Sequence, residues 1–277
     1  MSETVLEVSG LGKRYPGFQL DGVGFTLHRG EIMGLIGRNG AGKTTTLKAL
    51  LGFVHRDAGS IRFFGLDPAS QELEIKRRIG FVSGGANYYP GKKLKTILEV
   101  TRRFYPDWDE AVCADYMRLF ALDGDRQIRQ LSAGMQVKFA LVPALSRRAE
   151  LLILDEPTSG LDPVSREELL EIFLTLADRG VSILFSTHIT SDLEKCAESI
   201  TYIRAGKRLA SCPLREFEAA YRLAGLPEKS ADARVLGQRR TRDGYTALLH
   251  TADAEGFPAR RATLEEIMVH LETEEPA

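Results

Sequence analysis

Cysteine is scarce in this sequence. The chain has three cysteines, Cys113, Cys196 and Cys212, which lie far apart and show no metal-ligand spacing. This number and distribution argue against a disulfide framework and a cysteine-based metal site, and they are typical of reduced thiols in a cytosolic protein.

The sequence also lacks an excess of charge and a long apolar run. Lys and Arg total 37 against 38 Asp and Glu, for a formal charge of -1, so no chain-wide basic surface for nucleic acid is expected. Apolar runs such as residues 49–54 and 151–154 are far shorter than the roughly 20 residues that cross a bilayer. Residues 1–9 contain no charged leader followed by an apolar stretch. We therefore expect a cytoplasmic protein that works at a membrane only through another chain.

The chain has enough apolar material for one large domain. Hydrophobic residues make up 43% of the 277 positions, as in ordinary globular proteins, and the length allows one large domain plus an appendage. Strand-like and helix-like segments alternate, which predicts an α/β fold with a parallel sheet. The expected strands are residues 5–8, 23–27, 32–36, 79–82, 151–154 and 181–185, and the expected helices are residues 44–51 and 165–178.

Three further regions differ from that alternation. The first two strands, separated by the Gly- and Pro-containing residues 10–17, predict an antiparallel β layer. Residues 94–146 have helical patterns, so we expect a helical subdomain at about residues 86–148. The last part of the chain is more polar and shows a hairpin pattern and a final amphipathic helix. We therefore divide the chain into a main domain, residues 1–212, and a small α+β module, residues 213–277.

The strongest motif is a phosphate loop. Residues 37–44 read GRNGAGKT, which fits G-x-x-x-x-G-K-[ST] and lies between an expected strand and an expected helix. The glycines let backbone N–H groups curve around a phosphate, and the helix N-terminus adds its positive end. In this motif the lysine, here Lys43, reaches the β- and γ-phosphates, and the hydroxyl, here Thr44, holds Mg²⁺. The sequence therefore predicts a nucleoside triphosphate site.

Two acids follow an apolar strand further along the chain. Residues 151–156 read LLILDE, so Asp155 and Glu156 come at the end of a buried strand. P-loop hydrolases have such a strand, whose first acid holds Mg²⁺. Glu156 points elsewhere and is placed to polarise the attacking water as a general base. Without the phosphate loop, two acids at the end of a strand would indicate only an ordinary solvated strand end. The presence of the phosphate loop favours the roles of metal ligand and general base.

Residues 131–135, LSAGM, resemble the signature motif of the ATP-binding cassette (ABC) family. The resemblance covers about residues 5–212. It implies a P-loop, RecA-like core with an antiparallel β subdomain and a helical subdomain. It also implies that Ser132 and Gly134 face a γ-phosphate bound by the opposite subunit, with ATP between two cassettes. From its local pattern alone, Ser132 is equally a helix N-cap.

Three weaker matches occur in the family's order. Tyr15 resembles the aromatic residue that stacks on adenine, Asp162 ends a segment similar to the D-loop, and His188 resembles the switch histidine on the γ-phosphate. Taken singly, each has a simpler role in packing or local hydrogen bonding. The candidate set comprises catalytic Glu156, His188 and Lys43, nucleotide-binding Tyr15, Gly37, Arg38, Asn39, Gly40, Ala41, Gly42, Lys43, Thr44, Thr45, Ser132, Gly134 and Asp162, and the Mg²⁺ ligands Thr44 and Asp155.

One position of the family pattern is not matched. The strand that ends at Ser83 is usually followed by Gln, but Gly84 and Gly85 follow it here. In the family this Gln contacts Mg²⁺ and the attacking water and begins the segment that senses the membrane partner. We hypothesise that Ser83 or Asn87 takes its place through a water molecule.

The resemblance implies the ATP-binding and ATP-hydrolysing subunit of an ABC transporter. Such a subunit pairs with an identical or sister cassette and powers a separate polytopic permease at the cytoplasmic face of the cell membrane. The signature ending in Met135 and the tail residues 262–267, ATLEEI, are similar to cassettes of ABC-2-type exporters, which favours export. Two alternatives stay open: a soluble ABC ATPase acting on a ribosome or nucleic-acid complex, and a slow nucleotide-gated regulatory cassette.

Overall fold

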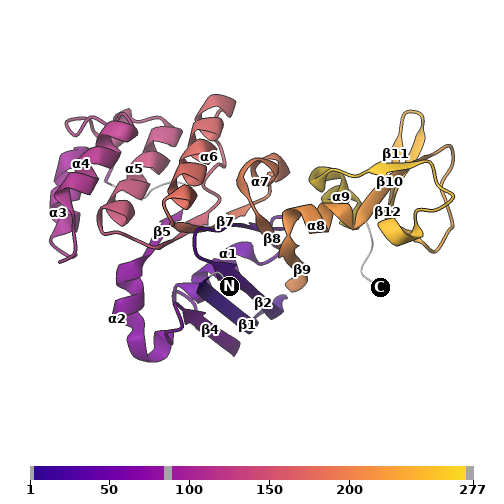
Figure 1. Ribbon diagram of the computed structural model, residues 1–277, viewed down its shortest axis with the longest axis horizontal. Coiled ribbons are helices and arrows are strands. Elements are labelled where there is room, and N and C mark those ends of the chain that lie inside the picture. The colour runs from indigo at the N-terminus through magenta and orange to yellow at the C-terminus, as the bar shows by residue number, and fades with distance from the viewer. Residues whose placement is uncertain (1–2, 84–88, 273–277) are drawn as a thin grey trace.

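The fold is that of a computed structural model in which residues 3–83 and 89–272 are described (Figure 1). The main body contains, in chain order, β1 (Thr4–Tyr15), β2 (Phe18–His28), β3 (Ile32–Ile36), α1 (Lys43–Leu50), β4 (Ala58–Phe63), α2 (Pro68–Arg78), β5 (Ile79–Ser83), α3 (Leu94–Arg102), α4 (Glu110–Leu119), η1 (Ile128–Gln130), α5 (Ala133–Ser146), β6 (Leu151–Asp155), α6 (Pro163–Asp178), β7 (Ser182–Thr187), α7 (Thr190–Cys196), β8 (Ser199–Arg204) and β9 (Lys207–Pro213). The C-terminal part adds α8 (Leu214–Ala219), β10 (Tyr221–Leu226), β11 (Val235–Thr241), β12 (Gly244–His250), η2 (Thr251–Asp253), β13 (Ala259–Arg261) and α9 (Leu264–Leu271).

A nine-stranded sheet of the described residues forms the main body, in the order β4-β1-β2-β9-β8-β3-β7-β6-β5. β3 is parallel to β7 and β8, and β6 is parallel to β5 and β7. All residues of β3 and β7 are buried, as expected for parallel strands that are covered on both faces. The α/β class with a parallel sheet is therefore confirmed, and the carboxyl ends of these strands meet at one edge.

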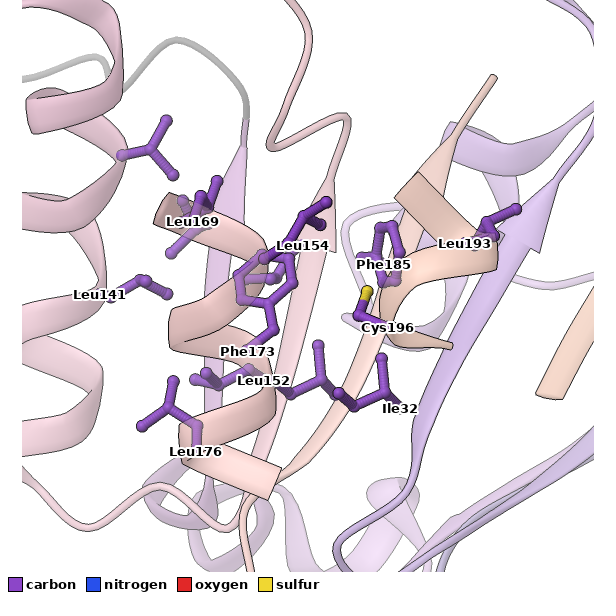
Figure 2. Close-up of a cluster of buried hydrophobic side chains, with 14 of the residues drawn as sticks. Ile32, Leu141, Leu152, Leu154, Leu169, Phe173, Leu176, Phe185, Leu193 and Cys196 are labelled. Atoms are coloured by element: carbon purple, nitrogen blue, oxygen red, sulfur yellow. The ribbon is translucent and has the colours of Figure 1, made fainter. Parts of the chain in front are cut away.

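Helices cover one face of this sheet. Figure 2 shows Leu169, Phe173 and Leu176 of α6 directed at the strands, close to Leu152 and Leu154 of β6. Burying each such side chain contributes about 1.5–3 kcal/mol. On the other face, α1 and the antiparallel strands β1, β2 and β4 enclose a second apolar cluster. The edge that carries the polar motifs is therefore held between two rigid layers.

The antiparallel layer is confirmed, but the break between its strands, expected over residues 10–17, is shorter and consists of Pro16 and Gly17. β1 continues to Tyr15 and pairs with β2 and β4. Gly10 has a φ of 61°, and the β1–β2 register shifts between Val8 and Leu11 and again between Leu11 and Lys13. These irregularities let the strand bend and continue, so the glycine acts as a bulge residue instead of a terminator.

The helical region and the C-terminal part follow the predicted patterns. α3, α4, η1 and α5 occupy the segment with helical patterns. β11 and β12 form the expected hairpin, and α9 begins with a capping box of Thr263 and Glu266. A four-stranded antiparallel sheet, β11-β12-β10-β13, packs against α9, which also contacts α7. β9 still pairs with β8 up to Pro213, and the division at residue 212 stays a prediction.

Candidate active site

The phosphate loop lies between the end of β3 and the start of α1, as predicted. Gly37, Gly40 and Gly42 have φ angles of 151°, 83° and 115°, in the region that favours glycine. A Cβ atom on Gly37 would lie 2.2 Å from the carbonyl oxygen of Ile203, so only glycine fits there. The chain therefore turns tightly into α1, whose N-terminus presents N–H groups and the positive end of its dipole to an anion.

The remaining loop residues differ in exposure. Arg38, Asn39 and Gly40 are exposed, Thr45 is half-buried and Ala41 is buried. The N–H of Ala41 donates to the carbonyl oxygen of Arg38 over 3.1 Å and closes the turn. The middle of the loop is therefore open to solvent, and its two ends are anchored in the core.

Lys43 connects the loop to the acids. Its side chain is 5% exposed, and its Nζ donates to the carbonyl oxygen of Gly37 over 2.8 Å. The same Nζ lies 3.3 Å from Oε1 of Glu156. A buried ammonium group needs such partners, so Lys43 holds a fixed positive charge at the loop.

Asp155 lies at the carboxyl end of β6, beside β7. Its Oδ1 accepts a hydrogen bond from the Thr44 hydroxyl over 3.2 Å and one from the Ser186 hydroxyl over 2.6 Å. The predicted pair of Thr44 and Asp155 is thus brought together, although 111 positions separate them. Two hard oxygen donors in contact are the kind of group that Mg²⁺ prefers.

Glu156 has a backbone φ of 50°, so the chain turns sharply after the strand. Its N–H donates to the Ser186 hydroxyl over 3.0 Å and to the Ser186 carbonyl oxygen over 3.2 Å. Its Oε2 lies 2.8 Å from Nδ1 of His188, and its Oε1 faces Lys43. The two acids therefore point to different partners, as the sequence predicts, and Glu156, His188 and Lys43 form one cluster.

Ser186 is a residue of this site that the sequence analysis missed. It is fully buried on β7 and joins the Asp155 carboxylate to the Glu156 backbone. A hydroxyl residue near the carboxyl end of an apolar strand, two positions before His188, is the sequence signal that points to it.

The signature residues lie at the start of α5. The Ser132 hydroxyl accepts a hydrogen bond from the Met135 N–H over 3.2 Å, so Ser132 is a helix N-cap, and its side chain is exposed. A Cβ atom on Gly134 would lie 2.9 Å from Cβ of Ser165, so this glycine lets α5 approach α6. The exposed N-terminus of α5 thus remains available to an anion from outside this chain.

Asp162 and Tyr15 are also exposed. Asp162 caps α6 by accepting the N–H groups of Val164 and Ser165, each over 3.0 Å, and Ser165 lowers the pKa of its carboxyl group most. Tyr15 ends β1 and has Lys13 above its ring, 5.7 Å from the centroid. Among residues 3–83 and 89–272, no hydrogen bond or ion pair joins Ser132, Asp162 or Tyr15 to the Lys43 cluster.

The unmatched family position lies at the end of β5. Ser83 pairs in register with Asp155, so it stands next to the predicted metal ligand. Gly84, Gly85 and Asn87 lie outside the described residues. That Ser83 or Asn87 performs the role of the missing Gln therefore stays a hypothesis. The position of Ser83 beside Asp155 is compatible with it.

A glycine loop between a parallel strand and a helix, with an acid-tipped strand beside it, defines a P-loop nucleotide-binding fold. Comparison with known proteins gives the particular family. The family model for "ABC transporter" matches residues 20–159. The chain belongs to this family, and the fold implied by the resemblance is confirmed.

Two relatives illustrate the similarity. The ABC transporter ATP-binding protein YtrB of Bacillus subtilis is 31% identical over 219 residues, which cover 78% of this chain and 75% of YtrB. The Nod factor export ATP-binding protein I of Burkholderia pseudomallei is 35% identical over 217 residues, 76% of this chain and 71% of that protein. These relatives are transport subunits, so the chain is an ABC transporter ATPase, and the ribosomal or nucleic-acid alternative is not supported.

A solved structure supports the same conclusion. The ATP-binding subunit of an ABC transporter superposes with a TM-score of 0.70 at 30% identity, covering 77% of this chain and 92% of that one. Cassettes of this family bind ATP and hydrolyse it to power transport. Within the part of the chain that the structure describes, no helix has the length and apolar content to cross a membrane.

Proposed function

We propose that this chain is the ATPase subunit of an exporter, in which ATP-dependent pairing of two cassettes drives a separate membrane permease. The observation that carries the proposal is the cluster of Lys43, Glu156 and His188 beside the phosphate loop. The export function of the Nod factor relative and the exporter-like tail support the direction of transport.

ATP would bind with its phosphates in the loop. The N–H groups of the loop and the N-terminus of α1 receive the β-phosphate, and the Lys43 ammonium turns from Glu156 to the β- and γ-phosphate oxygens. The ring of Tyr15, which is 41% exposed at the end of β1, would stack on the adenine. Arrival of the phosphates would thus separate Lys43 from Glu156 and free the carboxylate for chemistry.

Mg²⁺ fits the oxygen pair of Thr44 and Asp155, which would hold it. When bound, it neutralises phosphate charge that develops during the transfer. The hydrogen bond from Ser186 orients the Asp155 carboxylate for this role, because it occupies one side of Oδ1. Ser83, in register with Asp155, would approach the same ion through a water molecule.

Glu156 would act as the general base. The attacking water gives its proton to the Glu156 carboxylate while its oxygen forms a bond to the γ-phosphorus, and the bond to the ADP oxygen breaks. His188, whose Nδ1 lies 2.8 Å from Oε2, holds the carboxylate in place and would contact the γ-phosphate. The left-handed backbone of Glu156 aims its side chain at this position.

The second cassette would contact the exposed caps of α5 and α6. Ser132 and the backbone of Gly134 present the N-terminus of α5, whose dipole attracts a γ-phosphate held by the other cassette. Asp162 and the neighbouring Val164, which is 67% exposed, provide a second patch on the adjoining helix.

The permease would cover an aromatic surface beside β5. Phe53 is 63% exposed and packs edge-on against Phe81, with ring centroids 5.7 Å apart. Tyr89 and Phe104, which are 80% and 74% exposed, lie before and after α3 in the sequence. Exposed aromatic side chains are favoured in the cores of protein interfaces. Such docking would put the protein at the cytoplasmic face of the membrane, with residues 213–277 as an accessory module.

The first test measures phosphate release from ATP by the purified chain. Lys43→Ala should abolish nucleotide binding, because the buried charge at the loop is lost. Glu156→Gln should keep ATP binding and lower kcat by about 100-fold or more, the usual worth of a general base. Hydrolysis by Glu156→Gln at the parent rate would refute the assignment of the base, and negligible turnover of the parent chain would favour the regulatory alternative.

The second test captures the partner. Tagged Glu156→Gln protein is incubated with ATP and detergent-solubilised membranes of the native host, and co-purifying proteins are identified by mass spectrometry. A polytopic membrane protein should be retained, and Phe53→Ser should release it with basal ATP hydrolysis unchanged. Leu73→Ser, 77% exposed on α2, is the matched control and should retain it. Retention of ribosomal or DNA-associated proteins alone would contradict the transporter proposal.

A further inference from the structure

Two buried polar side chains, Thr158 and Asp192, form a cluster with the half-buried Arg166. Thr158 and Asp192 are 0% exposed, and the Nε of Arg166 lies 3.9 Å from Oδ1 of Asp192. Among the described residues, Thr158 Oγ1, Arg166 Nε and both Asp192 carboxylate oxygens have no hydrogen-bond partner. A distance of 3.9 Å is too long for a hydrogen bond. Buried polar groups without partners are rare in folded proteins, so this cluster calls for an explanation.

The cluster unites three segments that the proposed mechanism uses. Thr158 follows Glu156 by two positions, and Arg166 lies in the first turn of α6, after Asp162. Asp192 lies in the first turn of α7, four positions after His188. The segments that follow the base, Asp162 and His188 along the chain therefore each contribute one residue of this cluster.

This arrangement is poorly suited to stabilising the fold. Burial raises the pKa of the Asp192 carboxyl group, and the nearby Thr158 and Arg166 only counteract part of that effect. A buried ion pair with long contacts seldom adds stability compared with neutral side chains of similar shape. Asp192 is therefore better explained by the segments that it holds in place than by a contribution to the unfolding free energy.

Few hydrogen bonds hold the beginning of α7. Its N-cap, Ile189, provides no side-chain hydrogen bond to the helix. The Ile189 N–H donates to the Thr187 hydroxyl over 3.0 Å, and the Asp192 N–H donates to the Ile189 carbonyl oxygen over 3.3 Å. Further along, Glu194 accepts the N–H of Leu264 from α9, so the far side of α7 is tied to the C-terminal helix. In the first turn of α7, Asp192 is the buried side chain that faces Arg166 of α6.

We propose that Asp192 is a positioning residue, which with Arg166 and Thr158 sets the switch segment so that His188 meets Glu156. The inference rests on the proposed function. A displacement of α6 when a second cassette binds would reach His188 through Arg166 and Asp192. The cluster thereby links the contact between cassettes to the orientation of the base.

The test compares Asp192→Asn with the parent chain in the full-length protein. The amide has the same shape without the charge, so the thermal unfolding temperature and the KM for ATP should stay near the parent values. We expect kcat to fall about 10-fold, as small misplacements of catalytic groups do. The matched control is Glu167→Gln, because Glu167 pairs with Lys195 across the same α6–α7 contact but at the surface, and it should leave kcat unchanged.

A double-mutant cycle distinguishes positioning from a structural role. In a His188→Ala background, Asp192→Asn should change kcat by less than about 2-fold, because Asp192 acts through His188. An equal loss in both backgrounds, an unchanged kcat, or the same loss in Glu167→Gln would overturn the proposal. If Asp192→Asn does not fold, Thr158→Val, which keeps the side-chain shape, must show the same pattern.

A failure of the proposed function can be distinguished from a failure of the positioning role of Asp192 by measuring Glu156→Gln in the same assay. If it hydrolyses ATP like the parent chain, the catalytic assignment fails. If Glu156→Gln is inactive while Asp192→Asn retains the parent kcat, only the positioning role of Asp192 is wrong.

Discussion

Replacing Ser186 by alanine tests how the site is held together. The Ser186 hydroxyl donates to Asp155 over 2.6 Å and accepts the Glu156 N–H over 3.0 Å. A hydrogen bond to a charged group contributes about 1.5–3 kcal/mol. The Glu156 N–H keeps the Ser186 carbonyl oxygen at 3.2 Å, and Asp155 keeps the Thr44 hydroxyl, so the loss falls on the bond to Asp155.

We therefore expect Ser186→Ala to lower the unfolding free energy by about 1.5–3 kcal/mol. We also expect kcat to fall about 10-fold, which corresponds to about 1.4 kcal/mol in the activation free energy. The concentration of Mg²⁺ needed for half-maximal hydrolysis should rise, because the Asp155 carboxylate is no longer oriented. Urea unfolding and phosphate release across a Mg²⁺ titration measure these quantities.

The control for Ser186→Ala is Ser182→Ala on the same strand. Ser182 is fully buried at the opposite end of β7, where its hydroxyl accepts the Gly30 N–H over 3.0 Å. Ser182→Ala should cost about 1 kcal/mol of unfolding free energy and leave kcat unchanged. Parent-like kcat and Mg²⁺ dependence in Ser186→Ala, or an equal loss of kcat in Ser182→Ala, would refute the role of Ser186.

Two further predictions concern the loop and the C-terminal helix. Gly37→Ala should abolish binding of a fluorescent ATP analogue, because its Cβ would meet the Ile203 carbonyl oxygen at 2.2 Å. Gly40→Ala meets no atom within 4 Å and strains only its own backbone, whose φ is 83°, so it should weaken binding less. Equal binding by both variants would contradict this. The hydrogen bond from Arg260 lowers the pKa of Glu266 from 4.5 to about 2. The ionised Glu266 therefore contributes fully to the unfolding free energy above pH 4.5, and this contribution is lost as the pH falls toward 2. Since Arg260 is 61% exposed, Glu266→Gln should remove about 1 kcal/mol at neutral pH and reduce the acid sensitivity of chemical unfolding, and identical acid profiles would refute it.

Much of the fold could be predicted because its signals are local. The alternation of apolar strands and helices predicted the parallel sheet, and the capping box of Thr263 and Glu266 predicted α9. The break expected at residues 10–17 was too long, because Gly10 allows both a turn and a bulge, and only pairing with β2 and β4 decides between them.

The phosphate loop could be predicted from the sequence alone, since its chemistry lies within eight consecutive residues, 37–44, whose glycines and lysine act through local backbone geometry. The contacts between distant side chains, in contrast, depend on the packing of the fold. Ser186 reaches Asp155 because parallel strands bring their carboxyl ends to one edge of the sheet. Asp192 faces Arg166 because α6 and α7 pack against each other. The sequence separation of two residues does not show whether they make such a contact, because the contact depends on how the buried layers pack.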